Sequence, residues 1–375
     1  MIKKRVAIVR CESYDEDEVY KALKKGIDLL GGVNKFFKKG ERILLKPNVL
    51  FGEDPKKASL THPAVFNAMI RVLKDRIKLV YGDSPGFGSS LASLKNSGMK
   101  KVADKYKIEL GDFENGKNVD FPEGKICKKF LIANAFFNVD GVVNIPKMKT
   151  HNLTRISGAV KNQFGFVVGL NKAKCHARFP NSIAFSKMLV DLSLFLKTRL
   201  HVMDGIVAME GNGPRAGNPI SMNCLIISED PVAVDATFLK MINFDPTMVP
   251  TCKYGGMYGL GTYNPKEIEY VGEDLEKFIN KKFDIKKESL VNTTFLGFIP
   301  AFIRNWFASK PVIDSNKCVK CGICAKACPI GEKALCFQDK TKPPVYNYNN
   351  CIRCFCCQEM CPHRAIDIIG PFKKK

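Results

Sequence analysis

Eight cysteines near the C-terminal end of the 375-residue sequence stand at regular spacings. They form two runs of the pattern C-x-x-C-x-x-C-x-x-x-C, closed by Pro329 in the first run and Pro362 in the second. This pattern is typical of bacterial ferredoxin modules that hold two [4Fe–4S] clusters. A structural zinc site usually pairs two C-x-x-C hooks over a longer gap, and would leave the third cysteine of each run unexplained.

The spacing also predicts which cysteines share a cluster. The first three thiolates of a run wrap one face of a cluster in a tight loop, whereas the fourth has passed into the following segment and reaches the neighbouring cluster. One predicted set is therefore Cys318, Cys321, Cys324 and Cys361, and the other is Cys351, Cys354, Cys357 and Cys328.

The other seven cysteines lie outside this spacing. Cys356 adjoins a predicted ligand, and we expect it at most to hydrogen-bond or shield a cluster. The rest are interpreted as small buried hydrophobic residues: Cys11, Cys127, Cys175, Cys224, Cys252 and Cys336.

A second polar signature, NIPKMKTHNLTRISGAVKNQFGFV, occupies residues 144–167. Lys147, Lys149 and His151 alternate along an expected strand end, so an extended backbone turns all three to one side. A helical stretch with Lys161 and Asn162 follows. Strand end, polar turn and helix N-terminus together would bind an anionic small molecule or cofactor. A solvated lysine-rich loop is the alternative.

Carboxylates follow other expected strands. Asp83 lies in GDSPG, where we expect a tight turn with an exposed carboxylate, and Asp204 and Glu210 lie in MDGIVAMEGNGP. Such carboxylates, with lysines and a histidine, would either coordinate Mg²⁺ or exchange protons with an anionic substrate. The predicted catalytic residues are thus His151, Lys149, Asp83, Asp204 and Glu210, and the predicted cofactor-binding residues are Lys147, Lys161 and Asn162.

Short apolar runs rich in Val, Ile and Leu alternate with longer stretches of helical periodicity up to about residue 245. The expected strands lie at 4–10, 41–48, 77–83, 140–146 and 200–209, and the expected helices at 15–30, 61–76, 182–197 and 230–242. Thr61 and Asp230 are the expected N-caps of two helices. This alternation predicts an α/β fold with a mostly parallel sheet, whose ligands bind beyond the carboxyl ends of the strands.

The pattern divides the chain into three parts. We expect an α/β domain over residues 1–290, a linker helix over 291–310, and a small α+β dicluster ferredoxin domain over 311–375. The segment near residue 300 is interrupted by Pro300 and Arg304, so no transmembrane segment is predicted. The first ten residues lack the apolar run of a signal peptide, and fifteen cysteines fit a reducing compartment, so a cytoplasmic location is expected.

The formal net charge of +22 favours acidic partners, which include anionic small molecules, acidic redox proteins, nucleic acid and an anionic membrane face, and it does not choose among them. Nucleic acid is disfavoured because the aromatic residues do not interleave with basic ones and no recognition motif occurs.

The motifs KPN, THP, GDSPG, IPKMKTH with KNQFG, MDGIVAMEGNGP and DPVAVDA occur in this order between residues 46 and 236. They resemble the iron–sulfur proteins that carry domain of unknown function 362, in which a C-terminal ferredoxin module is a common companion. The resemblance implies this architecture and a bacterial or archaeal, anaerobic setting, but no catalytic role.

The leading hypothesis is an iron–sulfur oxidoreductase that passes electrons between two [4Fe–4S] clusters and an anionic small molecule or cofactor, with an electron-transfer protein as partner. The alternatives are a non-redox enzyme or binding protein whose clusters are structural or sense oxygen, and, less favoured, a nucleic-acid-binding protein.

Overall fold

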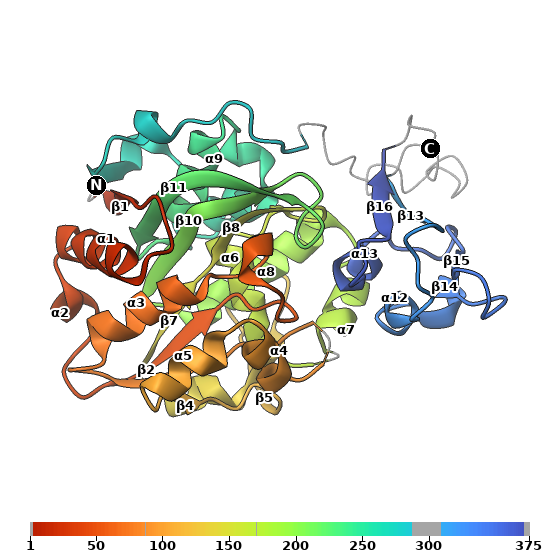
Figure 1. Ribbon diagram of the computed structural model, residues 1–375, viewed down its shortest axis with the longest axis horizontal. Coiled ribbons are helices and arrows are strands. Elements are labelled where there is room, and N and C mark those ends of the chain that lie inside the picture. Colours follow the sequence, from red (N-terminus) through yellow and green to blue (C-terminus); the bar gives the residue numbers. More distant parts are fainter. Residues whose placement is uncertain (1–2, 87, 170, 287–308, 371–375) are drawn as a thin grey trace.

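The computed structural model describes residues 3–86, 88–169, 171–286 and 309–370. Figure 1 shows a large α/β domain with a smaller C-terminal module beside it. The predicted α/β fold is confirmed. All but the last two residues of the expected linker helix, 291–310, lie outside the described residues. No helix within the described ranges is long and apolar enough to span a membrane.

A ten-stranded sheet forms the centre of the large domain. Its main strands are parallel except one, because β11 runs antiparallel to both of its neighbours. From edge to edge the order is β12 (Ile268–Gly272), β1 (Lys4–Arg10), β11 (Asn218–Ser228), β10 (Leu200–Glu210), β7 (Gly141–Ile145), β2 (Arg42–Pro47), β3 (Lys78–Tyr81) and β4 (Glu109–Leu110).

Two short strands extend this sheet towards the module. β8 (Lys147–His151) follows β7 after a single proline and pairs in parallel with β10. β9 (Arg155–Ile156) then pairs antiparallel with β8. The polar motif that begins at Lys147 is therefore held in extended backbone by β10, as the alternation of its side chains predicts.

The five strands expected from apolar runs are all present, whereas β4, β11 and β12 of the main sheet were not predicted. The first half of β11, NPISMN, is interrupted by the polar residues Asn218, Ser221 and Asn223 and is more exposed, so it lacks the apolar run by which the other strands are found. β11 forms because it pairs with β10 along its whole length, from Glu210↔Asn218 to His201↔Ser228.

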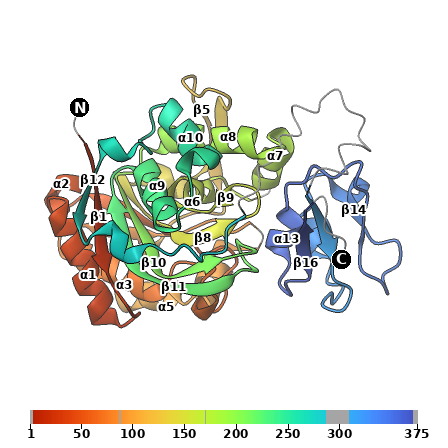
Figure 2. The ribbon, with the colours of Figure 1, turned by 90° about the horizontal axis from the view of Figure 1, so that it is seen from above.

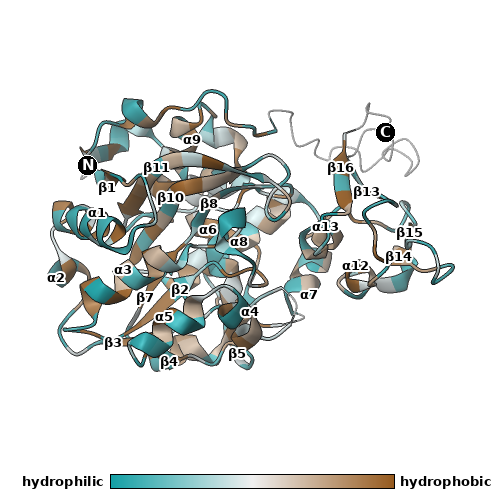
Figure 3. Ribbon diagram, in the orientation of Figure 1, coloured by the Kyte–Doolittle hydropathy of each residue, from teal (hydrophilic) through white to brown (hydrophobic). Residues whose placement is uncertain are grey.

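Helices cover both faces of the sheet and bury an apolar cluster on each side. Figure 3 shows hydrophobic residues along the strands and hydrophilic residues on outer helices such as α1. One layer contains α1 (Glu16–Leu29), α2 (Val33–Phe36), α3 (Pro63–Leu73), α4 (Ser90–Asn96) and α5 (Met99–Lys105). The other contains α6 (Ala159–Asn162), α7 (Asn171–Arg178), α8 (Ser182–Leu196), α9 (Pro231–Met241) and α10 (Pro250–Met257).

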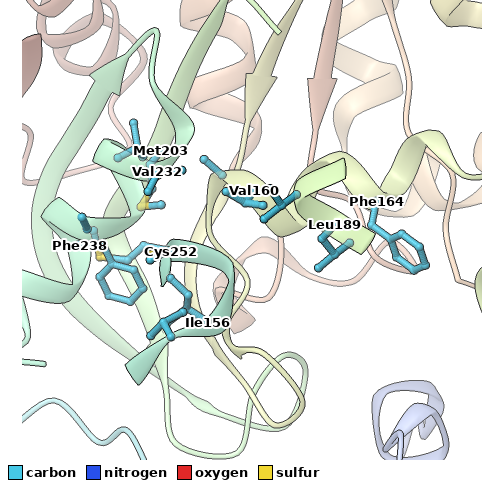
Figure 4. Close-up of a cluster of buried hydrophobic side chains, with 14 of the residues drawn as sticks. Ile156, Val160, Phe164, Leu189, Met203, Val232, Phe238 and Cys252 are labelled. Atoms are coloured by element: carbon cyan, nitrogen blue, oxygen red, sulfur yellow. The ribbon is translucent and has the colours of Figure 1, made fainter. Parts of the chain in front are cut away.

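The second layer fixes the helix that carries Lys161 and Asn162. In Figure 4, Val160 of α6 lies among apolar side chains of neighbouring elements, including Leu189 of α8 and Val232 of α9. At the start of α6, the buried carboxylate of Asp235 accepts hydrogen bonds from the Ala159 and Val160 amides. The short helix is thus held at both its apolar face and its N-terminus.

Of the two predicted helix N-caps, the one at the start of α9 is confirmed and the one at the start of α3 is wrong. Asp230 caps α9 by accepting from the Val232 and Ala233 amides, as expected. The N-cap of α3 is His62 rather than Thr61. The Thr61 hydroxyl instead donates to the Ile145 carbonyl, 2.6 Å away, and so ties the helix start to β7.

The C-terminal module contains two antiparallel pairs and two short helices. β13 (Lys310–Ile313) pairs with β16 (Ile366–Ile369), and β14 (Leu335–Cys336) pairs with β15 (Val345–Tyr346). The helices are α12 (Ile323–Lys326) and α13 (Cys356–Met360). In Figures 1 and 2 the module lies to one side of the sheet, with α13 facing the large domain.

Candidate functional site

Two cavities in the C-terminal module are each lined by four of the predicted cluster cysteines. Each set combines three cysteines of one run with the fourth of the other run. The first cavity is lined by Cys318, Cys321, Cys324 and Cys361, and the second by Cys328, Cys351, Cys354 and Cys357. Four thiols around one cavity are the donor set of a [4Fe–4S] cluster, so the residues fit the predicted group.

The backbone repeats itself around the two cavities. Lys320 and Gly322 have φ of 61° and 73°, and the equivalent residues Arg353 and Phe355 have φ of 58° and 62°. Left-handed residues at alternate positions curl each loop around its cavity, a conformation that only glycine adopts without strain. The shared geometry supports the interpretation of the two runs as an internal repeat.

Hydrogen bonds also reach two of these sulfurs. The Tyr346 hydroxyl donates to Cys357 Sγ at 3.2 Å, and the Ala365 amide donates to Cys361 Sγ at 3.3 Å. Such bonds to ligand sulfurs help to set the reduction potential of a cluster.

Within the described ranges, no three Cys, His, Asp or Glu side chains converge as they would around a single metal ion.

A cavity of about 110 Å³ with both apolar and charged lining residues lies between the large domain and the module. The large domain contributes the residues just beyond β2 and β3, together with Lys149 of β8 and parts of α6 and α7. The opposite wall comes from α12 and α13 of the module, through Lys326, Cys356 and Glu359. The cavity therefore lies at the carboxyl ends of parallel strands, where α/β sheets bind their ligands.

Lysines are the most frequent charged residues that line this interdomain cavity. Lys149, Lys161, Lys172 and Lys326 line it, against two carboxylates, Asp83 and Glu359. Neither Lys149 nor Lys172 has a carboxylate within ion-pair distance among the described residues. Burial lowers the pKa of both side chains to about 7, with Lys161 adding to the effect on Lys149. The cavity favours an anion, which would relieve these unfavourable charges.

Asp83 differs from the sequence-based expectation. Its carboxylate is buried rather than exposed, and Lys46 Nζ lies 2.6 Å from Asp83 Oδ1. Gly165 is required here, because a side chain at that position would collide with Asp83 and Lys46. The negative charge of Asp83 therefore neutralises the positive charge of Lys46 at the cavity wall.

Asn162 organises the same wall. Its Oδ1 accepts from Asn48 Nδ2 at 2.9 Å and lies 3.4 Å from Lys46 Nζ, and its Nδ2 donates to Asn144 Oδ1 at 2.7 Å. Asn48 in turn accepts a hydrogen bond of 2.8 Å from Lys149 Nζ. Asn162 thus connects the ends of β2 and β7 to the lysine of β8.

His151 joins the two parts of the chain. Its Nδ1 accepts from the Leu153 amide, so Nε2 carries the hydrogen, and Nε2 lies 2.7 Å from Glu359 Oε1 of α13. The two side chains are in direct contact, although the ring N–H does not point straight at the oxygen. Burial, with Lys161 as the next cause, lowers the pKa of His151 to about 4, so the imidazole is neutral at pH 7. Burial opposes ionisation of Glu359, but His151 and Lys161 hold its pKa below the usual range.

The remaining predicted residues lie elsewhere. Lys147 Nζ is 2.8 Å from Asp204 Oδ2, and both side chains are fully buried beside Tyr14. Glu210 accepts a hydrogen bond from the Asp284 amide at 2.7 Å. Lys147, Asp204 and Glu210 do not occur among the described residues that line the interdomain cavity. The structure therefore brings together Lys149, Lys161, Asn162 and Asp83, with His151 behind Glu359.

The charged or titratable lining residues that sequence reasoning missed are Lys172, His176, Lys326 and Glu359. Lys326 and Glu359 occupy equivalent positions in the two cysteine runs, two residues before the fourth cysteine. That equivalence was visible in the sequence, but only the packing of the module shows that both positions face the large domain.

Comparisons with known proteins agree with these two parts. The family model described as domain of unknown function matches residues 43–240, and a 4Fe–4S dicluster domain matches residues 310–362. A thylakoid-associated protein of Synechocystis sp. is 32% identical over 268 residues, which cover 71% of this chain and 82% of that protein.

Among solved structures, the chain is similar to the lactate racemase apoprotein of Thermoanaerobacterium thermosaccharolyticum. The TM-score is 0.42 and the identity 14%, over 64% of this chain and 57% of that chain. The family matches confirm the resemblance stated from the motifs. The chain belongs to the family of proteins that carry domain of unknown function 362, and it bears a 4Fe–4S dicluster domain on its C-terminal side.

Proposed function

We propose that the protein is an iron–sulfur oxidoreductase that passes electrons between two [4Fe–4S] clusters and an anionic small molecule bound in the interdomain cavity. One observation carries this proposal, namely the position of the cavity. Its lysines belong mainly to the α/β domain, and its opposite wall is built from α12 and α13, which contain cysteines of the two cluster sets.

The proposed ligands are the crossed sets of four cysteines that line the two module cavities. When bound, [4Fe–4S] clusters supply one-electron transfer at a potential set by their surroundings. Cys356, which adjoins the ligand Cys357 of one set, lines the interdomain cavity, and so does Met360, which adjoins the ligand Cys361 of the other set. A molecule in the cavity would therefore lie close to both cysteine sets.

The cavity residues have distinct roles in this proposal. Lys161 contacts the anionic group, because its ammonium has no carboxylate within ion-pair distance among the described residues. Asp83 is already paired with Lys46, so an anion suits the cavity better than Mg²⁺ does. His151 and Glu359 position the module against the bound molecule.

The proposal also retains a cytoplasmic location and an electron-transfer protein as redox partner. Both rest on the sequence and on the ferredoxin-type domain. The Synechocystis relative is a thylakoid-associated protein.

The experiment that tests the proposal starts from anaerobically purified protein. Bound small molecules are identified by mass spectrometry, and their reduction by dithionite is followed. In Lys161→Met, affinity for the bound anion should fall about ten- to hundredfold, the loss expected for one charge-assisted contact. Iron content should not change. The control is Lys105→Met, because Lys105 is an exposed residue of α5, far from the cavity, whose contacts are with Glu16 at 3.8 Å and the adjacent Tyr106 ring.

The redox step is tested separately with Cys324→Ser. This variant should lose one cluster, still bind the anion and reduce it more slowly. An unchanged reduction rate in a variant shown to lack the cluster would contradict the redox role. If anion binding, stability and cluster content instead fall together, the clusters are structural.

A further inference from the structure

Lys149 differs from the other fully buried lysines in its hydrogen bonds. Its Nζ donates to Asn48 Oδ1 at 2.8 Å and to the Ser59 carbonyl at 2.5 Å. A neutral amine has two hydrogens and one lone pair, whereas an ammonium has three hydrogens and no lone pair. Two acceptors therefore satisfy a neutral Lys149 completely and leave its lone pair free at the cavity that the side chain lines.

Lys172, which lines the same cavity, provides the contrast. Its Nζ has three oxygen partners, Ser84 Oγ at 2.8 Å and the Pro85 and Val167 carbonyls at 3.2 and 2.5 Å. Three acceptors match the three hydrogens of an ammonium and leave no position for a lone pair. Lys46 and Lys147 are ion-paired with carboxylates.

The charges around Lys149 also favour the neutral amine. Burial is the main cause that lowers its pKa to about 7, and Lys161 and Lys147 lower it further against the opposing effects of Glu359 and Glu53. A buried lysine beside a second cation is an established arrangement for an amine nucleophile. Among the lysines described, Lys149 combines this environment with a nitrogen lone pair that is free at a cavity.

We propose that Lys149 forms a Schiff base with the carbonyl carbon of a small 2-oxo acid whose carboxylate contacts Lys161. The inference rests on the proposed function, because it names the class of anion in that cavity. Lys161 supplies the cation for the carboxylate, and the cavity of about 110 Å³ limits the acid to a few carbon atoms.

The step balances without a further reactant. The Nζ lone pair attacks the carbonyl carbon and forms the N–C bond, while the C=O bond becomes C–OH. The hydroxyl then leaves as water, so both amine hydrogens depart with the carbonyl oxygen. The imine takes up one proton from solvent, and the iminium N–H donates to the Ser59 carbonyl, which already accepts from Nζ.

The test traps the imine in the full-length protein purified with its clusters. Pyruvate and glyoxylate are the probes, cyanoborohydride is the reductant, and the modified lysine is located by peptide mass spectrometry. Lys149 should be labelled saturably at pH 7, and roughly a hundredfold faster than exposed lysines because far more of it is unprotonated. Lys172 should stay unlabelled. Acetone, which lacks the carboxylate, should label Lys149 much more slowly than pyruvate.

The control is Lys149→Arg, which keeps N–H donors for the two acceptors but cannot form an imine. Melting temperature and iron content are measured for this variant and for Lys149→Met, so that misfolding is recognised. Pyruvate binding is measured by calorimetry without reductant. Saturable pyruvate binding with no adduct on Lys149 would overturn the Schiff base and leave the anion site intact. Adducts spread over surface lysines without saturation would also overturn it. Absence of any binding of either acid would instead count against both proposals.

Discussion

Lys147 and Lys149 lie two residues apart on β8, both about 1% exposed, yet the structure gives them opposite roles. Lys147 is ion-paired with the fully buried Asp204, whereas Lys149 faces the interdomain cavity without a carboxylate partner among the described residues. The same change, lysine to methionine, should therefore have different effects on stability at the two positions.

In Lys147→Met, Asp204 loses its cation and keeps hydrogen bonds from Tyr14 and from the His62 amide. Removing one partner of a buried ion pair costs about 3–5 kcal/mol in the free energy of unfolding. For a domain of this size each kcal/mol lowers the melting temperature by about 2–4 °C, so a fall of about 6–20 °C is expected.

In Lys149→Met, two hydrogen bonds are lost, at a cost of about 0.5–1.5 kcal/mol each. The unfavourable burial of the amine is removed at the same time, and methionine fills a similar volume. We expect these effects largely to cancel, with a change within about 1–2 kcal/mol.

The assay is thermal unfolding followed by circular dichroism under anaerobic conditions, with iron content measured in parallel. Equal destabilisation by the two changes would refute the distinction between a structural and a ligand-facing lysine. As a further check, adding Asp204→Leu to Lys147→Met should recover much of the lost stability, because a buried pair replaced as a whole by apolar residues is often tolerated.

Three further predictions follow from the described contacts. Cys324→Ser should reduce the iron content from about eight atoms per chain, whereas Cys356→Ser should retain it, as iron and acid-labile sulfide analysis will show. Because the pKa of Lys149 is lowered to about 7 from the ordinary 10.5, the unfolded chain binds the proton more tightly between these values. The stability of the wild type relative to Lys149→Met should therefore rise with pH above about 7, as measured by urea unfolding. Arg215 pairs with Glu53 at 2.7 Å and donates a hydrogen bond to the Met360 carbonyl at 3.1 Å. Arg215→Met should therefore speed the hydrogen exchange of backbone amides in α13. The control is Arg199→Met, on a residue paired with Glu41, which should leave this exchange unchanged.

Features that depend on neighbours in the chain could be predicted from the sequence. The cysteine runs and their repeat are visible because a cluster-binding loop needs thiols at fixed, short spacings. The α/β class is visible because buried strands and amphipathic helices have different periodicities. The row of Lys147, Lys149 and His151 is visible for the same reason, since alternation along a strand is local geometry.

What these side chains contact was decided by the tertiary structure. Lys147 is ion-paired with Asp204 across the β8–β10 register, and Asp83 is buried against Lys46 because β2 and β3 are neighbours. β11 is present because β10 offers it a full-length partner.

The interdomain cavity is the clearest case. Lys149 of β8 and Glu359 of α13 line the same cavity although they are about two hundred residues apart in the sequence. Their approach depends on how the module packs against the carboxyl ends of the strands, and neither residue's own segment contains that information. Spacing along the chain therefore determined which residues are able to do chemistry, and packing between distant segments decided which of them meet, because charge, burial and hydrogen bonding act through space.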